Sequence, residues 1–210
     1  MPRTDTPAVT APLFYSLPAR VLHWTVALLV LITAPLGFIM HDRSDTKIAD
    51  ESLKAAFEAT TDMMYSWHKL IGLVILALMV FRLSYRFMNG APRPEPTLTP
   101  LEKGLSHAVH WTMYLLLIVI PVVGYIGISY GDYLTVFGMK LPGLVSVHEG
   151  DGHDKIADWY FDIHGWAATI LLGLAGLHIL AALYHRFVKG DRVLARMVPG
   201  RDEGAGSDVA

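Results

Sequence analysis

Four long apolar stretches dominate the pattern of hydrophobic and polar positions along the chain. They cover about residues 17–40, 67–87, 105–129 and 162–188. A helix needs about 20 mainly apolar residues to cross a hydrocarbon core of about 30 Å, and each stretch has at least that length. Because backbone groups in lipid must form their hydrogen bonds within the segment, the pattern predicts an all-α membrane protein with four transmembrane helices.

The polar segments between these stretches predict how the helices are separated. We interpret "IADESLKAAFEATTDMMY", residues 48–65, as a short helix lying on the membrane surface. The prolines of "APRPEPTLTP", residues 91–100, are expected to end the second helix before the third begins. We expect one membrane domain over residues 1–200 and a disordered tail over residues 201–210.

Composition supports a membrane protein and restricts its chemistry. Hydrophobic residues make up 53% of the chain and charged residues 17%, and the mean hydropathy is +0.40. The chain has no cysteine, which excludes disulfides, thiolate metal sites and Cys-ligated iron–sulfur clusters. A net charge of −2, without a basic stripe, argues against a nucleic-acid partner. A metal centre therefore has to use histidine or carboxylate ligands.

Lys and Arg concentrate on one side of the predicted membrane. The N-terminal region, the segment 82–103 and the C-terminal tail hold 11 of the 17 basic residues. Because cytoplasmic loops carry this excess in membrane proteins, both termini are predicted to be cytoplasmic. The two outer connections, residues 41–66 and 130–161, are then rich in Asp and Glu.

Four histidines fall at two matched depths. His164 and His178 are 14 residues apart, which places them about 21 Å apart on one face of a helix. His68 begins the second stretch at the outer level of His164, and His23 lies about two turns into the first stretch, level with His178. The sequence therefore predicts two histidine pairs, one in each leaflet.

Such pairs have a specific use in a membrane. An ionisable side chain at this depth needs a partner and marks a functional site by default. Two neutral imidazoles on facing helices suit the axial positions of a haem iron, and the macrocycle is apolar enough to fill a bundle core. We therefore predict a bundle that encloses two b haems and transfers electrons. His110 lies at a depth similar to that of His23, and depth alone does not decide which of them faces His178.

Small and cationic residues recur at the same two depths. Gly37 follows His23 by 14 residues, and Arg82 follows His68 by 14 residues. A glycine lets a flat ring approach the helix backbone, and Arg82 is predicted to pair with haem propionates, with Arg20 as a second candidate. Further room for a ring is expected at Gly72, Gly165 and Gly173.

The other histidines leave several roles open. His185 lies two turns after His178 on almost the same face, where it either gives a hydrogen bond or a proton to a quinone or is an ordinary interfacial residue. His107 and His110 either reach interfacial water or serve a propionate or quinone. The outer connections hold His41, His148 and His153. We expect these connections to be ordinary acidic loops.

Four motifs together resemble the bacterial cytochrome b561 family. They are "YSLPARVLHW", "WHKLIGLVILALMVFR", "SHAVHWTMYLLLIVIPVVGY" and a fourth-stretch histidine pair followed by "HRFVKGDRVLARMVPG". The resemblance spans about residues 14–200. It implies an inner-membrane protein with two b haems, ligated by His23 with His178 and by His68 with His164, and a quinone site at His185.

The resemblance also implies candidate substrates. One family member is a superoxide oxidase that passes electrons from superoxide at the outer haem to ubiquinone at the inner side. The acidic outer connections oppose rapid capture of an anion unless Lys69 and Lys155 form a local cationic entry. They favour a basic protein donor such as a soluble cytochrome. The alternative is a cytochrome subunit that receives electrons from a bound dehydrogenase or another periplasmic redox protein.

Overall fold

The computed structural model describes residues 14–44, 51–145 and 153–198. The elements within these ranges are four long helices, α1 (Leu17–Ser44), α2 (Glu51–Asn89), α3 (Pro100–Tyr130) and α4 (His153–Tyr184), and two short strands, β1 (Thr135–Val136) and β2 (Met139–Lys140). A π-helical turn, His185–Lys189, and a 3-10 turn, Ala195–Met197, follow α4. All four helices are long and apolar enough to cross a membrane, which confirms the predicted fold class.

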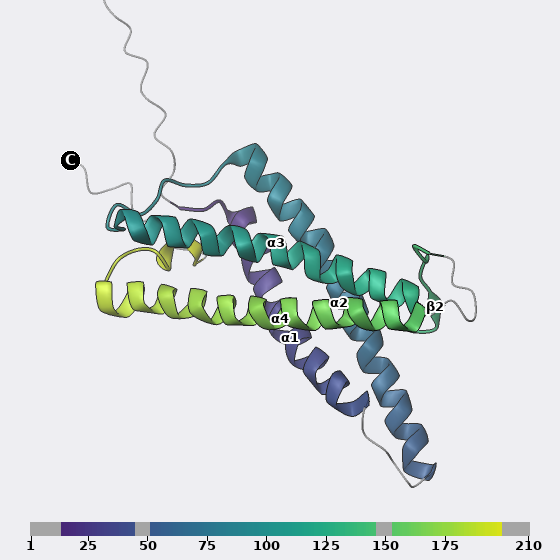
Figure 1. Ribbon diagram of the computed structural model, residues 1–210. Helices are drawn as coiled ribbons and strands as arrows, with labels where there is room; N and C mark the ends of the chain where they lie inside the picture. Colours follow the sequence, from purple (N-terminus) through teal and green to yellow (C-terminus); the bar gives the residue numbers. More distant parts are fainter. Residues whose placement is uncertain (1–13, 45–50, 146–152, 199–210) are drawn as a thin grey trace, which may run out of the picture.

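The helices pack as two crossing pairs. Figure 1 shows α3 and α4 side by side, while α1 and α2 cross them obliquely. The closest packing is between α3 and α4 and between α1 and α2, and α2 also packs against α3. We call the end that holds β1 and β2 the outer end and the end that holds residues 90–99 and 190–198 the inner end, after the orientation predicted above.

The second helix is much longer than its apolar stretch. It begins at Glu51 instead of near residue 67, and the predicted separate surface helix is wrong. No glycine or proline interrupts residues 51–66, and the Thr60 and Thr61 hydroxyls donate to the carbonyls of Ala56 and Phe57. Because nothing ends the helix there, it continues in line with the membrane segment and projects away from α3 and α4 (Figure 1).

The inner linker separates α2 from α3, as predicted from residues 91–100. Gly90 follows α2 with a φ of 72°, a left-handed conformation that glycine adopts readily. Thr99 then caps α3: its hydroxyl accepts from the Glu102 amide, and the Glu102 carboxylate accepts from the Thr99 amide. This capping box and Pro100 start α3 about one turn earlier than residue 105.

A β-hairpin that the hydrophobic pattern did not indicate covers part of the outer end. Strands β1 and β2 pair antiparallel through a two-residue turn, Phe137 and Gly138, with φ of 47° and 78°. Both values suit a type I′ turn. The Phe137 amide donates to the Ser66 hydroxyl, and the Phe137 ring meets the Trp67 ring edge-on at 5.1 Å. The hairpin is therefore fixed to α2 beside the outer histidine level.

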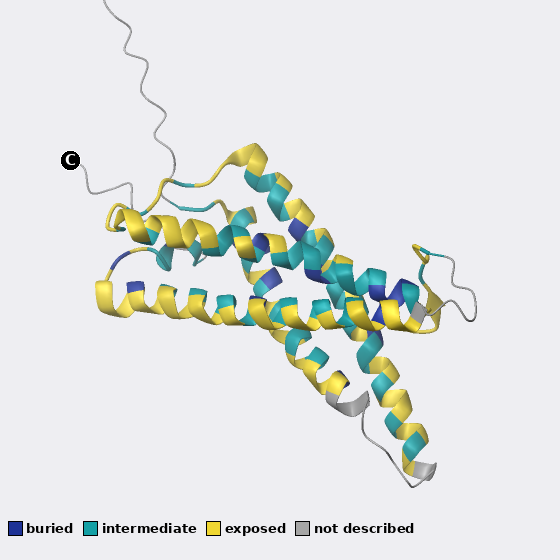
Figure 2. Ribbon diagram, viewed as in Figure 1, coloured by how far each residue is buried: buried dark blue, intermediate teal, exposed yellow. Residues whose placement is uncertain are grey.

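The buried core lies between the two histidine levels, where α1, α2 and α3 meet. It is formed by Val26, Ile75, Met79 and Tyr114. Figure 2 shows buried positions on the facing sides of the helices and exposed positions outside. Many exposed positions carry large apolar side chains, among them Leu31, Val80, Phe81 and Leu180. This outward distribution suits a surface that faces lipid.

Met79 tests this core. Its side chain is only 1% exposed, whereas the neighbouring Val80 is 53% exposed. Met79→Ala should lower the free energy of unfolding in detergent by about 2 kcal/mol, the low end for buried methionine, because lipid is as apolar as the core and mainly packing is lost. Val80→Ala is the control and should change it by less than about 0.5 kcal/mol. Equal effects of both substitutions would contradict this packing.

Candidate functional site

The four predicted histidines meet as two pairs from different helices. The outer pair is His68 on α2 and His164 on α4, with ring centres 5.9 Å apart. The inner pair is His23 on α1 and His178 on α4, with ring centres 6.2 Å apart. The rings of both pairs are steeply inclined, by 66° and 77°.

The residues predicted at the same depths lie beside these pairs. A Cβ at Gly37 would lie 3.1 Å from Cε1 of His68, so the glycine allows close approach of that ring to α1. The Arg82 guanidinium reaches the inner pair, with Nη2 3.4 Å from Nδ1 of His23. Gly37 and Arg82, each fourteen residues from a histidine of its own helix, therefore lie beside a histidine of the other pair.

The outer pair is oriented by the backbone and glycines of neighbouring helices. Nδ1 of His164 donates to the Ile120 carbonyl at 2.9 Å, which leaves Nε2 as the nitrogen available to a metal. A Cβ at Gly124 would lie 2.8 Å from that Nδ1, so a glycine is needed there. Nδ1 of His68 is buried near the Thr33 backbone without a well-formed hydrogen bond to the described residues.

Arg82 has three partners at the inner level. Its Nε donates to the Tyr114 hydroxyl at 3.1 Å, and its Nη1 donates to the Ala19 carbonyl at 2.8 Å. Its third nitrogen, Nη2, approaches Nδ1 of His23 to 3.4 Å. Arg82 is thus fixed beside the inner pair with its positive charge inside the bundle.

His110 also reaches the inner pair, but at a different distance. Its ring centre lies 4.9 Å from that of His178, and its Nδ1 contacts the Ser106 carbonyl on its own helix. His107, three residues before His110 toward the inner end of α3, is exposed, and its ring centre lies 6.0 Å from that of Trp111. The structure therefore groups three histidines at the inner level and two at the outer level.

The outer and inner pairs fit a haem in the spacing of their rings. A metal lies about 2.0–2.1 Å from an imidazole nitrogen, and the ring centre lies about 1.2 Å beyond it, so two imidazoles on opposite sides of one iron would have centres about 6.4–6.6 Å apart. The separations of 5.9 and 6.2 Å are within about 0.7 Å of this value, whereas the 4.9 Å between His110 and His178 is shorter by about 1.5 Å or more. Added Cβ atoms would meet nothing within 4 Å at Gly72, Gly165 and Gly173.

Arg20 contacts the C-terminal segment. Its side chain is buried, and Nη1 donates to the Val198 carbonyl at 3.0 Å. Trp24 on the same helix donates to the Met197 carbonyl at 2.8 Å, and the Tyr15 amide donates to the Arg196 carbonyl. These contacts fix residues 196–198 against the start of α1.

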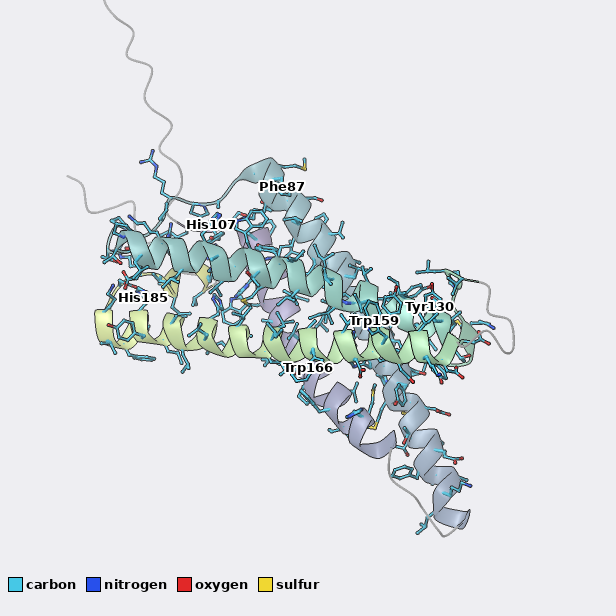
Figure 3. All side chains as sticks on the ribbon, in the orientation of Figure 1. Phe87, His107, Tyr130, Trp159, Trp166 and His185 are labelled. Carbon is cyan, nitrogen blue, oxygen red and sulfur yellow. The ribbon has the colours of Figure 1, made fainter. Side chains whose placement is uncertain are left out.

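His185 is buried in a second polar group at the inner end. It lies where the regular α4 helix gives way to the π-helical turn (Figure 3). Its Nδ1 lies 2.6 Å from Oδ2 of Asp191, and both residues are buried. Asp191 also accepts from the Thr97 hydroxyl and from the Val193 amide. The hydrophobic pattern did not single out Asp191, although the preceding "KG" signals a reversal of the chain there.

The environment of Asp191 changes its acidity. Burial alone would raise the pKa of this carboxyl, but hydrogen bonds from His185, the Val193 amide and the Thr97 hydroxyl outweigh burial and hold its pKa below the usual aspartate range. Asp191 is therefore an anion that pairs with His185.

Lys69 lies at the outer end, directly after His68. Its ammonium donates to the carbonyls of Tyr133 and Thr135 at 2.7 and 3.1 Å. The hairpin thus holds one positive charge next to the outer pair. Asp132, one of the acidic residues of this connection, pairs with Lys140 at 3.1 Å.

The remaining sequence candidates lie outside these groups. Arg86 packs over the rings of Trp111 and Tyr114, 5.8 Å from each ring centre. His41 is exposed at the outer part of α1. His148 lies outside the described residues. The expectation of a loop at His153 is wrong, because α4 begins at this residue, although its side chain is not described.

Comparison with known proteins identifies similar chains. The family model for prokaryotic cytochrome b561 matches residues 14–200. A probable superoxide oxidase CybB from Yersinia pestis is 35% identical over 63% of this chain and 76% of that protein. Cytochrome b561 homolog 2 from Escherichia coli (strain K12) is 32% identical over 62% of this chain and 68% of that protein. Cytochrome b562 from Cereibacter sphaeroides is 27% identical over 86% of this chain and 92% of that protein.

The depressed pKa of Asp191 predicts an acid-sensitive inner end. Its carboxylate adds stability above the ordinary aspartate pKa of about 3.9, and this contribution is lost as the pH falls through the lower pKa of the folded state. The thermal midpoint of the wild type should therefore exceed that of Asp191→Asn at about pH 5, and the difference should shrink toward about pH 2–3. Asp158→Asn, an exposed carboxylate on α4, is the control. A difference that grows in acid would contradict the predicted sign.

Proposed function

The chain belongs to the prokaryotic cytochrome b561 family, and we propose that it moves electrons through two b haems from a donor at the outer end to a quinone at the inner end. Family membership makes it a bacterial membrane protein that binds haem b and transfers electrons across the membrane. We also propose the number of haems, their ligands and both substrates. The proposal includes a location in the inner membrane with both termini in the cytoplasm.

The spacing of the two imidazole pairs carries this proposal. His68 with His164 and His23 with His178 come close to the separation that one iron requires. Their members on α4, His164 and His178, lie about 21 Å apart along that helix. A bound haem supplies an iron that takes up and gives back one electron at each level. The two imidazoles of each pair would hold that iron and would leave oxygen no position to bind it. This arrangement favours electron transfer over oxygen chemistry.

The nearby side chains suit the haem periphery. Arg82 lies beside the inner pair with its guanidinium inside the bundle. A propionate carboxylate of a haem held there would balance its positive charge. Gly37 and Gly124 allow the outer histidine rings to approach α1 and α3. We assign Arg82 to propionate binding. Arg20 holds Val198 through one nitrogen and is assigned to the same inner environment as a second cation.

We assign quinone reduction to the neighbourhood of His185. This residue lies seven residues beyond His178 on the inner side, about 10 Å along the chain direction. Imidazole can give a proton to a quinone oxygen near neutral pH. The buried pair of His185 and Asp191 supports this assignment, because an ordinary interfacial histidine would reach water instead.

Superoxide is the proposed donor. The relative from Yersinia pestis is named a probable superoxide oxidase. Lys69 supports the same substrate here, because its ammonium is held directly after His68 and lowers the cost of bringing an anion to the outer pair.

A basic protein donor is the second candidate at the outer end. Exposed carboxylates at this end, including Asp62, Asp154 and Asp158, favour a positively charged surface. A soluble cytochrome or a dehydrogenase that uses this chain as its membrane subunit would fit such a rim.

Haem content tests the core of the proposal. The purified wild type should carry about two b haems per chain, and His68→Ala and His23→Ala should each lower this ratio to about one because each removes an axial ligand. His110→Ala should retain about two. The measurement is the visible spectrum combined with a protein assay. Loss of a haem in His110→Ala with retention in His23→Ala would overturn the inner pairing, and a colourless wild type would overturn the whole proposal.

Salt dependence tests the donor. If Lys69 guides superoxide, the rate of superoxide-driven quinone reduction should fall about threefold between roughly 0.02 and 0.5 M ionic strength, and Lys69→Gln should lower the low-salt rate by a similar factor. Lys54→Gln, on the projecting part of α2, is the control. A rate that rises with salt would indicate repulsion by the acidic rim and would favour the protein donor.

A further inference from the structure

We propose that Asp191 is a positioning residue for quinone reduction: it fixes the ring of His185 so that Nε2 faces the quinone as its proton donor. This inference rests on the proposed function, because it needs a quinone at His185. It assigns a role to a carboxylate that binds neither substrate nor haem.

The local chain geometry brings Asp191 back onto its partner. The π-helical turn, His185–Lys189, ends at Gly190, which has a φ of 66°. The Asp191 amide then donates to the His185 carbonyl at 3.1 Å, and Oδ2 of Asp191 meets Nδ1 of the same histidine at 2.6 Å. Backbone and side chain of Asp191 therefore bind the same residue. π-helical turns within helices occur frequently at functional sites.

Asp191 is itself held from two other segments. The Thr97 hydroxyl of the inner linker donates to Oδ2 at 3.2 Å, and the Val193 amide donates to Oδ1 at 3.1 Å. The side chain of Asp191 is 2% exposed and that of His185 is 11% exposed. A buried carboxylate with these donors cannot turn away without leaving its charge unsatisfied, so it holds the imidazole in one orientation.

Neighbouring contacts anchor the segment that carries Asp191. The Arg196 guanidinium donates to the Arg93 carbonyl and lies near the Glu95 carboxylate at 4.0 Å. The Lys189 ammonium contacts the Glu102 carboxylate at 2.6 Å. These contacts join residues 189–196 to the linker and to the start of α3. The loop that carries Asp191 is therefore anchored on both sides.

The chemical consequence is a defined proton donor. Because the anionic carboxylate accepts from Nδ1–H, the second nitrogen, Nε2, is the one available to the quinone. Reduction of one quinone takes two electrons and two protons. Two superoxide ions release the electrons as they become oxygen. The Nε2–H bond of His185 breaks, and its proton passes to one quinone oxygen. Water supplies the proton to the other oxygen and then reprotonates Nε2. Asp191 keeps its charge throughout.

The test measures reoxidation of the reduced, haem-loaded protein by a short-chain ubiquinone, which makes the result independent of the donor. Asp191→Asn should lower the saturating rate by about tenfold or more, with the half-saturating quinone concentration within about twofold of the wild type. Asp191→Glu should restore part of the rate. Glu58→Gln, an exposed carboxylate on the projecting part of α2, is the matched carboxylate-to-amide control and should match the wild type. NMR of isotope-labelled histidine should show loss of the His185 Nδ1–H signal in Asp191→Asn.

The outcomes separate the two levels of the proposal. If His185→Gln is slow and Asp191→Asn keeps the wild-type saturating rate, Asp191 has no positioning role and the quinone site stands. If His185→Gln reduces quinone as fast as the wild type, the quinone assignment itself fails. If Asp191→Asn does not accumulate as a haem-loaded protein, the saturating rates of Asp191→Glu and Thr97→Val test the positioning role instead. A lower saturating rate in either, with haem retained, supports the role, and wild-type rates in both overturn it.

Discussion

A polar side chain inside a membrane must find its partner within the protein, and this constraint organises the whole bundle. The imidazole of His164 is satisfied by the Ile120 carbonyl. The guanidinium of Arg82 takes the Tyr114 hydroxyl and the Ala19 carbonyl. Each of these contacts joins different helices, so the groups that carry the chemistry also set which helices meet and at what height.

This constraint explains why much of the site was predictable from one sequence. Helical geometry converts the spacing of His164 and His178 into a depth, and the same arithmetic placed Gly37 beside His68 and Arg82 beside His23. The four spans followed from apolar length alone. Depth and length are one-dimensional quantities, and a sequence records them directly.

Other features depend on the face of a helix on which a side chain lies, or on the path of the chain before or after a helix. Hydropathy records neither. His23 and His110 share a depth, and only the distances of 6.2 and 4.9 Å to His178 distinguish them. The extension of α2 to Glu51 depends on the absence of a helix breaker in a polar segment. Asp191 reaches His185 through a left-handed Gly190, a conformation that the sequence permits but does not require.

The unbroken course of α2 has a consequence for how the chain tolerates changes in length. This helix carries His68 at one level and Arg82 at the other, so inserting a single residue between them would rotate one against the other by about 100°. The same holds between His164 and His178 on α4. Insertions are therefore tolerable in the connections at either end, whereas the number of residues between the two histidine levels has to stay constant.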